Sequence, residues 1–74
     1  MTKLPVTSGE QCVKALQRLG YIMERTRGSH VWMVCSGRQP IPVPKHKELG
    51  HGILRKIIST ADISIEEFVK LLKS

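Results

Sequence analysis

The chain lacks the features that mark membrane-spanning, exported or metal-stabilised proteins. No apolar run approaches the roughly 18 residues of a membrane-spanning helix, and none of signal-peptide length follows the first residues. Its two cysteines, Cys12 and Cys35, lack the paired spacing of structural zinc ligands. We therefore expect a cytoplasmic protein with no membrane association, no metal and no cofactor, and with both cysteines reduced in the core.

Acidic residues are also scarce, because six Asp and Glu stand against twelve Lys and Arg, giving a net charge of +6. The imbalance is strongest in the middle of the chain, where nine basic residues between Lys14 and Lys56 are opposed only by Glu24 and Glu48. Such an excess of positive charge is typical of a protein that binds a polyanion. A basic domain without such a ligand is the alternative.

Length limits the organisation of the protein. Its 74 residues leave no room for a second core, and they contain no repeat, low-complexity tract or linker. We expect one domain spanning residues 1–74. Since so small a core supplies only about 3–5 kcal/mol, a protein partner is expected to complete its stability.

Hydrophobic spacing predicts the order α-β-β-β-α-α. Ser8 with Gln11, and Ser64 with Glu67, have the spacing of a capping box at the start of a helix. Helices are predicted from Ser8 to about residue 19, from near Gly52 to residue 61, and after Ser64; strands are predicted at residues 21–26, 30–35 and 40–44. Short turns between the strands predict an antiparallel meander with helices on one face, a two-layer α+β domain.

Three prolines predict the place of the third strand. Pro40, Pro42 and Pro44 alternate with Ile41 and Val43, so their missing N–H donors all lie on one side. Only the other side can pair with a neighbour. The third strand is therefore predicted to lie at an edge of the sheet.

The residues around His30 are the most informative for chemistry. Gly28, Ser29 and His30 follow Arg25 and Arg27. Glycine lets a backbone approach a ligand closely, arginine matches phosphate oxygens, and histidine exchanges protons near neutral pH. The alternative is an ordinary strand histidine beside a turn.

RNA is a suitable substrate for such a site because it carries its own nucleophile, the 2′-hydroxyl. A placed histidine can move a proton while cations stabilise the phosphorane charge, and the products would carry 2′,3′-cyclic phosphate and 5′-hydroxyl ends. No metal is needed for this chemistry.

Two further residues near this segment each have two possible roles. His46, between Lys45 and Lys47, is either a phosphate or proton-transfer group or part of a solvated charged loop. Trp32, the only tryptophan, either stacks on an unpaired base or is buried in the core. We expect the face of the second strand that bears His30 and Trp32 to be the open one.

Several short motifs, taken in order, resemble those of the HicA toxin family across nearly the whole chain. They are Ser8-Gly9, Leu19-Gly20-Tyr21, Arg27-Gly28-Ser29-His30, Val43-Pro44-Lys45-His46, Gly52-Ile53-Leu54 and Ile63-Ser64-Ile65-Glu66-Glu67-Phe68. One departure is Ile53, where the family often has threonine. Because a capping hydroxyl is thereby lost, we expect the following helix to begin less firmly.

The resemblance implies a double-stranded-RNA-binding-domain-like fold, here with an extra C-terminal helix. It also implies a metal-independent messenger RNA interferase that arrests growth, inhibited by a HicB-type antitoxin that masks the active site. The family's catalytic histidine falls on His30, its glycine and serine on Gly28 and Ser29, and its third-strand proline and histidine on Pro44 and His46.

Together these observations predict an endoribonuclease toxin with His30 as general base or acid. The residues expected to bind RNA are Arg25, Arg27, Gly28, Ser29, Lys45, His46 and Lys47. The main alternative is a non-catalytic RNA-binding module of the same fold. A DNA-binding regulator is less favoured because the chain has no helix-turn-helix spacing.

Overall fold

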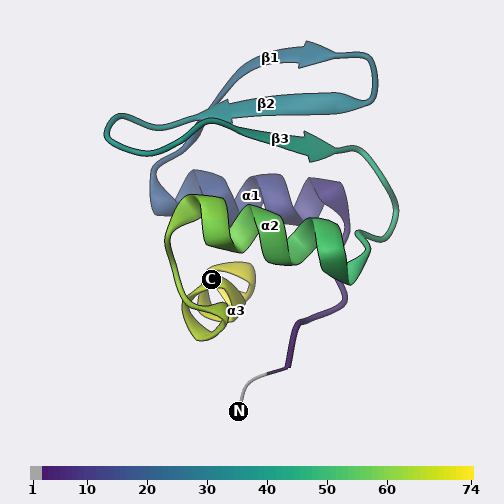
Figure 1. Cartoon of the computed structure of the whole chain (residues 1–74), viewed down its shortest axis with the longest axis vertical. Helices are drawn as coiled ribbons and strands as arrows, with labels where there is room; N and C mark the ends of the chain where they lie inside the picture. The colour runs from purple at the N-terminus through teal and green to yellow at the C-terminus, as the bar shows by residue number, and fades with distance from the viewer. Residues whose placement is uncertain (1–2) are drawn as a thin grey trace.

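The computed structural model describes residues 3–74 and arranges them as a three-stranded sheet and three helices (Figure 1). The elements are α1 (Gly9–Leu19), β1 (Ile22–Arg27), β2 (His30–Val34), β3 (Ile41–Pro44), α2 (His51–Ala61) and α3 (Ile65–Lys73). The predicted α+β fold, with its element order and antiparallel meander, is confirmed.

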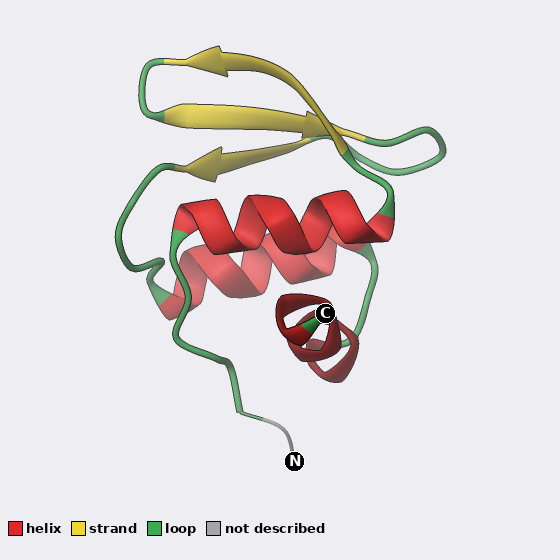
Figure 2. Ribbon diagram, turned by 180° about the vertical axis from the view of Figure 1, so that it is seen from behind, coloured by secondary structure: helices red, strands yellow, loops and turns green. Residues whose placement is uncertain are grey.

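Helices cover only one face of the sheet. α1 and α2 lie side by side against that face, and α3 lies on their far side, where it packs on α1 (Figures 1 and 2). Along β2, Val31 and Met33 point towards the helices and are buried, while His30 is exposed on the other face. The expectation that the face with His30 and Trp32 is open is therefore correct.

The core lies between the sheet and α1 and α2, and continues to α3. Its largest fully buried side chains are Tyr21, Phe68, Leu16, Met33, Ile41, Leu49, Leu54, Val43 and Cys12. Both cysteines are free thiols, as expected, but only Cys12 lies inside the core, whereas Cys35 is half-buried at its margin.

The start of α2 differs from the expectation. Its N-cap is Gly50, which has no side chain with which to cap the helix, and Ile53 lies three residues further on, inside the first turn. The side chain at position 53 is therefore not the one that would cap the helix. By contrast, the capping box of Ser8 and Gln11 is present at α1.

The prolines determine how the sheet ends. β2 is the central strand, and β3 pairs with it alone, with Val43 opposite Val31 and Ile41 opposite Met33. The predicted edge position of this strand is confirmed. Because Pro42 and Pro44 have no N–H to offer, the outer side of β3 cannot donate a regular set of hydrogen bonds to another strand.

β1 contains a bulge that the sequence pattern did not predict. Arg25 lies opposite Trp32, but Met23 lies opposite Met33, so the register shifts by one residue at Glu24. Because side chains alternate along a strand, this shift places both Ile22 and Arg25 on the open face.

Candidate nucleic-acid interface

A tight turn presents His30 at the start of β2. Arg27 and His30 are cross-strand partners, which leaves Gly28 and Ser29 as the two turn residues. Gly28 has a positive φ of 60° and Ser29 does not, the pattern of a type II′ hairpin turn. Glycine is thus needed for the turn itself. No atom lies within 4 Å of where a Gly28 Cβ would be, so space for a ligand is also present.

His30 lies between the ends of both edge strands. Its cross-strand partner on β1 is Arg27, and its partner on β3 is Pro44. All three residues of the turn and its exit, Gly28, Ser29 and His30, are exposed. The imidazole is therefore accessible to a large ligand lying on the open face, with an arginine on the neighbouring strand.

The segment after β3 is held against the same turn. The Lys45 amide donates a hydrogen bond of 2.6 Å to the Ser29 carbonyl oxygen, which extends the β2–β3 ladder beyond Pro44. The structure thus brings together two predicted groups, the Gly28-Ser29-His30 turn and the Lys45-His46-Lys47 run. The predicted meander, with strands at residues 30–35 and 40–44, already implied that these two segments lie close together.

The N-terminus of α1 fixes the position of His46. The Gly9 amide donates to the His46 carbonyl oxygen at 2.9 Å, and the Leu49 amide donates to the Thr7 carbonyl oxygen at 2.8 Å. A groove between α1 and the inner side of the sheet is lined by Ser8, Gly9, Glu10, Val13, Met23, Val31, Val43, Lys45, His46 and Lys47. His30 does not line this groove, so the structure does not place the two histidines in one cavity.

Arg25 and Trp32 form a pair on the open face. The guanidinium carbon of Arg25 lies 5.8 Å from the centroid of the Trp32 ring, within the range of a cation–π interaction. The indole is half-buried. Trp32 is therefore not part of the core. Of the two alternatives that the sequence left open, burial in the core is excluded.

The cations of this region are not neutralised within the protein. Within residues 3–74 the only ion pair is that of Lys14 and Glu10 on α1. The side chains of Arg25, Arg27, Lys45 and Lys47 are exposed and have no carboxylate partner in that part of the chain. Their charges remain available to an anionic ligand.

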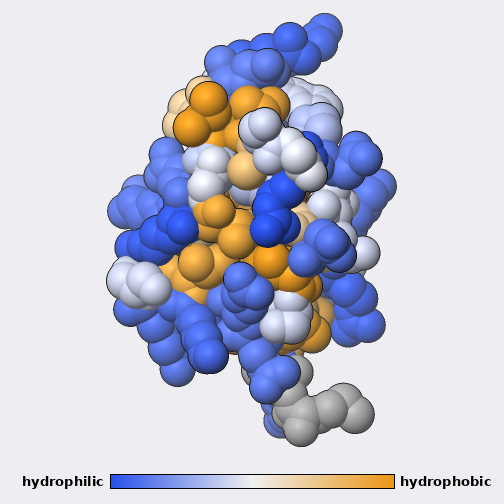
Figure 3. Space-filling view, turned by 90° about the vertical axis from the view of Figure 1, so that its left-hand side faces the viewer, coloured by the Kyte–Doolittle hydropathy of each residue, from blue (hydrophilic) through white to orange (hydrophobic). Residues whose placement is uncertain are grey.

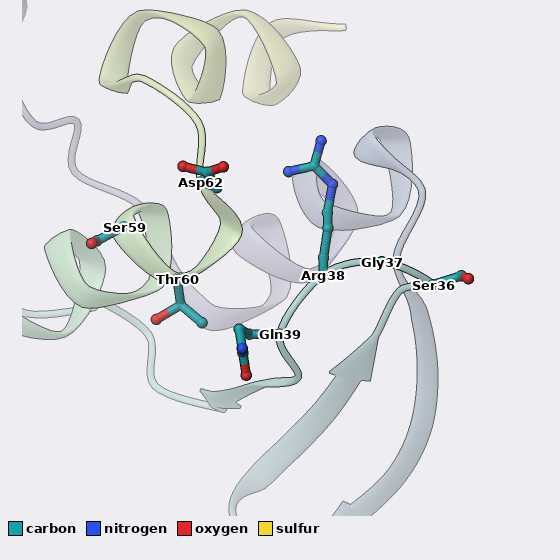
Figure 4. A pocket seen from close by; sticks show the side chains of 7 residues that line it. All are labelled: Ser36, Gly37, Arg38, Gln39, Ser59, Thr60 and Asp62. Carbon is teal, nitrogen blue, oxygen red and sulfur yellow. The ribbon is translucent and has the colours of Figure 1, made fainter.

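A second hollow lies at the opposite end of the sheet, between the β2–β3 turn and the end of α2 (Figure 4). It is lined by Ser36, Gly37, Arg38, Gln39, Ser59, Thr60 and Asp62. The Arg38 guanidinium donates to the Ala61 carbonyl oxygen, so this cation already stabilises the C-terminal end of α2. We assign this hollow a structural role.

The cysteines and histidines do not assemble into a metal site in the described chain. Among residues 3–74, no three His, Cys, Asp or Glu side chains are placed to hold an ion. Burial raises the pKa of the Cys12 thiol to about 12, so this thiol keeps its proton at neutral pH. None of the helices in the same residues is long and apolar enough to cross a membrane.

Comparison with known proteins identifies the family. The sequence model of the HicA toxin of bacterial toxin-antitoxin systems matches residues 9–63. The chain belongs to the HicA toxin family. No curated protein sequence shows significant similarity to it. Among solved structures, this HicA-family chain is similar to one from "Toxin-Antitoxin complex from Streptococcus pneumoniae", with 33% identity and a TM-score of 0.70 over 77% of this chain and 98% of that chain.

The matched residues contain every predicted site residue of this HicA-family toxin. They include the turn before His30, the Arg25–Trp32 pair and the Lys45-His46-Lys47 run. α3 follows the matched region, which ends at residue 63. This last helix therefore lies outside the residues that the family model matches.

Proposed function

We propose that this toxin is a metal-independent endoribonuclease that cleaves messenger RNA in the cytoplasm and so arrests growth, with His30 as its catalytic residue. The observation that carries the proposal is the placement of an exposed His30 between Arg27 on one strand and the Ser29–Lys45 contact on the other side. A proton-transfer group thus lies on the open face beside the exposed Arg27, and the exposed Lys45 follows the end of the neighbouring strand β3.

In the proposed reaction the 2′-oxygen of the RNA attacks the adjacent phosphorus, and the bond from phosphorus to the 5′-oxygen breaks. His30 either removes the proton of the 2′-hydroxyl or supplies the proton to the 5′-oxygen, and water takes or gives the other proton. Arg27, Lys45 and the turn at Gly28 and Ser29 attract and admit the phosphate, whose charge grows in the transition state. The products are a 2′,3′-cyclic phosphate and a 5′-hydroxyl end.

His46 has a secondary part in this proposal. Its main chain accepts a hydrogen bond from the α1 N-terminus, and the residue lines the groove, which His30 does not line. We assign it to RNA binding together with Lys45 and Lys47, with Arg25 and Arg27 binding on the open face.

The decisive experiment is cleavage of a defined RNA in EDTA by the wild-type protein and by His30→Ala. His51→Ala, which changes an exposed histidine at the first position of α2, is the matched control, and His46→Ala tests the secondary assignment. Circular dichroism establishes that each variant folds. We expect cyclic phosphate ends from the wild-type and His51→Ala proteins, and a loss of about 100-fold or more in rate for His30→Ala.

Two results would contradict the proposal. Equal cleavage by wild-type and His30→Ala proteins would remove His30 from the chemistry. Tight RNA binding by both, without cleavage by either, would show a non-catalytic RNA-binding module of the same fold.

We further propose that a HicB-type antitoxin inhibits the toxin by covering the face that bears His30. That face continues into apolar side chains where β1 begins and β2 ends: Ile22 is 64% exposed and lines a shallow hollow with Val34 and Cys35. Figure 3 shows apolar side chains gathering at this end of the molecule. An antitoxin resting there would shield apolar surface and exclude RNA together.

A further inference from the structure

The open face carries an aromatic ring with a planar cation lying over it. Arg25 and Trp32 are direct cross-strand partners, and the guanidinium lies 5.8 Å from the ring centroid. On the other side of Trp32 the cross-strand partner is Pro42, which is exposed. The pair is thus held by the register of the sheet rather than by a mobile loop.

This pair lies one step from His30. Trp32 is the second residue after His30 and lies on the same face of β2, at a rise of about 6.6 Å along the strand. That distance is comparable to one nucleotide of extended RNA. Arg27, the partner of His30, lies on the same strand as Arg25 and repeats the same spacing.

We propose that Arg25 and Trp32 form a stacking platform for one unpaired base of the RNA, next to the phosphodiester at which His30 transfers a proton. This inference rests on the proposed function, since it requires that the chain binds RNA. The base stacks on the plane of the guanidinium, which the indole orients, or on the exposed part of the indole.

The platform requires the substrate to be single-stranded at this point. Bases inside a duplex already stack on their neighbours and present only their edges and backbone, so they cannot lie flat on a sheet face. Phosphate binding alone would need the charge of Arg25 but neither its planar shape nor the ring beneath it. This difference in chemistry separates base stacking from simple charge attraction.

The single tryptophan makes the first test direct, because fluorescence excited where only tryptophan absorbs, and not Tyr21, reports on Trp32 alone. The probes are a 2′-O-methyl eight-nucleotide single strand, which lacks the nucleophile and cannot be cut, and an abasic oligomer of equal length and charge. We expect fluorescence quenching by the first probe and little by the second, with affinity lower by about five- to a hundredfold for the abasic oligomer. Equal affinity for both probes, with no quenching, would overturn the proposal.

The second test separates shape from charge with conservative variants. Arg25→Lys keeps the charge and removes the plane, while Trp32→Phe keeps an aromatic ring and Trp32→Ala removes it. Arg55→Lys, at an exposed position on α2, is the matched control. We expect affinity for the 2′-O-methyl strand to fall by about fivefold or more for Arg25→Lys and Trp32→Ala, less for Trp32→Phe, and not for Arg55→Lys.

These outcomes are distinct from those of the proposed function. If the wild-type protein cleaves RNA and both Arg25→Lys and Trp32→Ala bind the 2′-O-methyl strand with full affinity, the ribonuclease function stands and the stacking platform is rejected. The face would then serve to bind a protein partner. Quenching and weakened variants without any RNA cleavage would retain the platform and reject the catalytic role of His30.

Discussion

The amide of Gly9 donates a hydrogen bond to the carbonyl oxygen of His46 at 2.9 Å, where α1 begins against the end of β3. A Cβ added at Gly9 would overlap the Pro44 carbonyl oxygen. The helix can approach the strand this closely only because residue 9 has no side chain.

We therefore expect Gly9→Ala to destabilise the protein by at least about 1–3 kcal/mol, seen as a fall in Tm of about 5–20 °C. The control is Gly52→Ala within α2, where an added Cβ meets nothing within 4 Å and the helix gains stability. Thermal unfolding followed by circular dichroism measures both. An unchanged Tm in Gly9→Ala would show that α1 can move away from β3 at little cost.

Burial of Cys12 predicts a loss of stability at alkaline pH. Burial raises the pKa of this thiol from 9.0 to about 12. The unfolded chain therefore releases the proton above pH 9 while the folded chain keeps it. The free energy of unfolding is thus unaffected by this thiol below pH 9, and it falls as the pH rises towards 12. Burial also raises the pKa of Tyr21, which acts in the same direction above pH 10.

The contribution of Cys12 is isolated by urea unfolding of wild-type and Cys12→Ala proteins at pH 8 and pH 10.5. The free energy of unfolding should fall by about 2 kcal/mol more in the wild type, because both proteins share the Tyr21 effect. Equal losses would mean that the thiol ionises in the folded protein at its ordinary pKa.

The helix outside the family-matched region should be part of the cooperative fold. Phe68 of α3 is fully buried, and the Arg18 guanidinium of α1 donates to the Leu71 carbonyl oxygen at 2.7 Å. We expect Phe68→Ala to cost about 3–5 kcal/mol in urea unfolding, and the exposed Lys73→Ala to have little effect. A loss below about 1 kcal/mol for Phe68→Ala would show that the site-bearing part folds without α3.

Salt dependence should reveal which cations contact phosphate. Lys45→Ala and Lys47→Ala should each weaken binding of the 2′-O-methyl strand and lower the slope of log affinity against log salt by about 0.7. Lys70→Ala, on the exposed side of α3, removes the same charge far along the chain and should leave the slope unchanged. Equal slopes in all proteins would exclude Lys45 and Lys47 from phosphate binding.

Local chemistry in the sequence predicted much of this fold. Ser8 and Gln11 form the expected capping box, and the alternating prolines place β3 at an edge because a missing donor acts within its own strand. The turn at Gly28 was predictable for the same reason. In each case the decisive interaction lies within a few residues of its cause.

The features that escaped prediction depend on contacts between distant segments. Nothing around Glu24 signals the bulge, which is seen only in the pairing of β1 with β2. The hydrogen bonds from Arg18 to Leu71 and from Arg38 to Ala61 likewise join segments far apart in the chain. In the candidate site, the residue types could be read from the sequence, and the predicted meander placed Lys45 near Ser29. The separation of His46 from His30 required the folded chain.

The proline-bearing strand also limits how copies of this protein can associate. With β3 unable to donate on its outer side, strand pairing between molecules is left to β1. Two β1 strands that meet across a two-fold axis use up each other's free edge, so the pair is closed and offers no further edge. Strand pairing through this sheet can therefore yield a dimer but cannot propagate into a fibre.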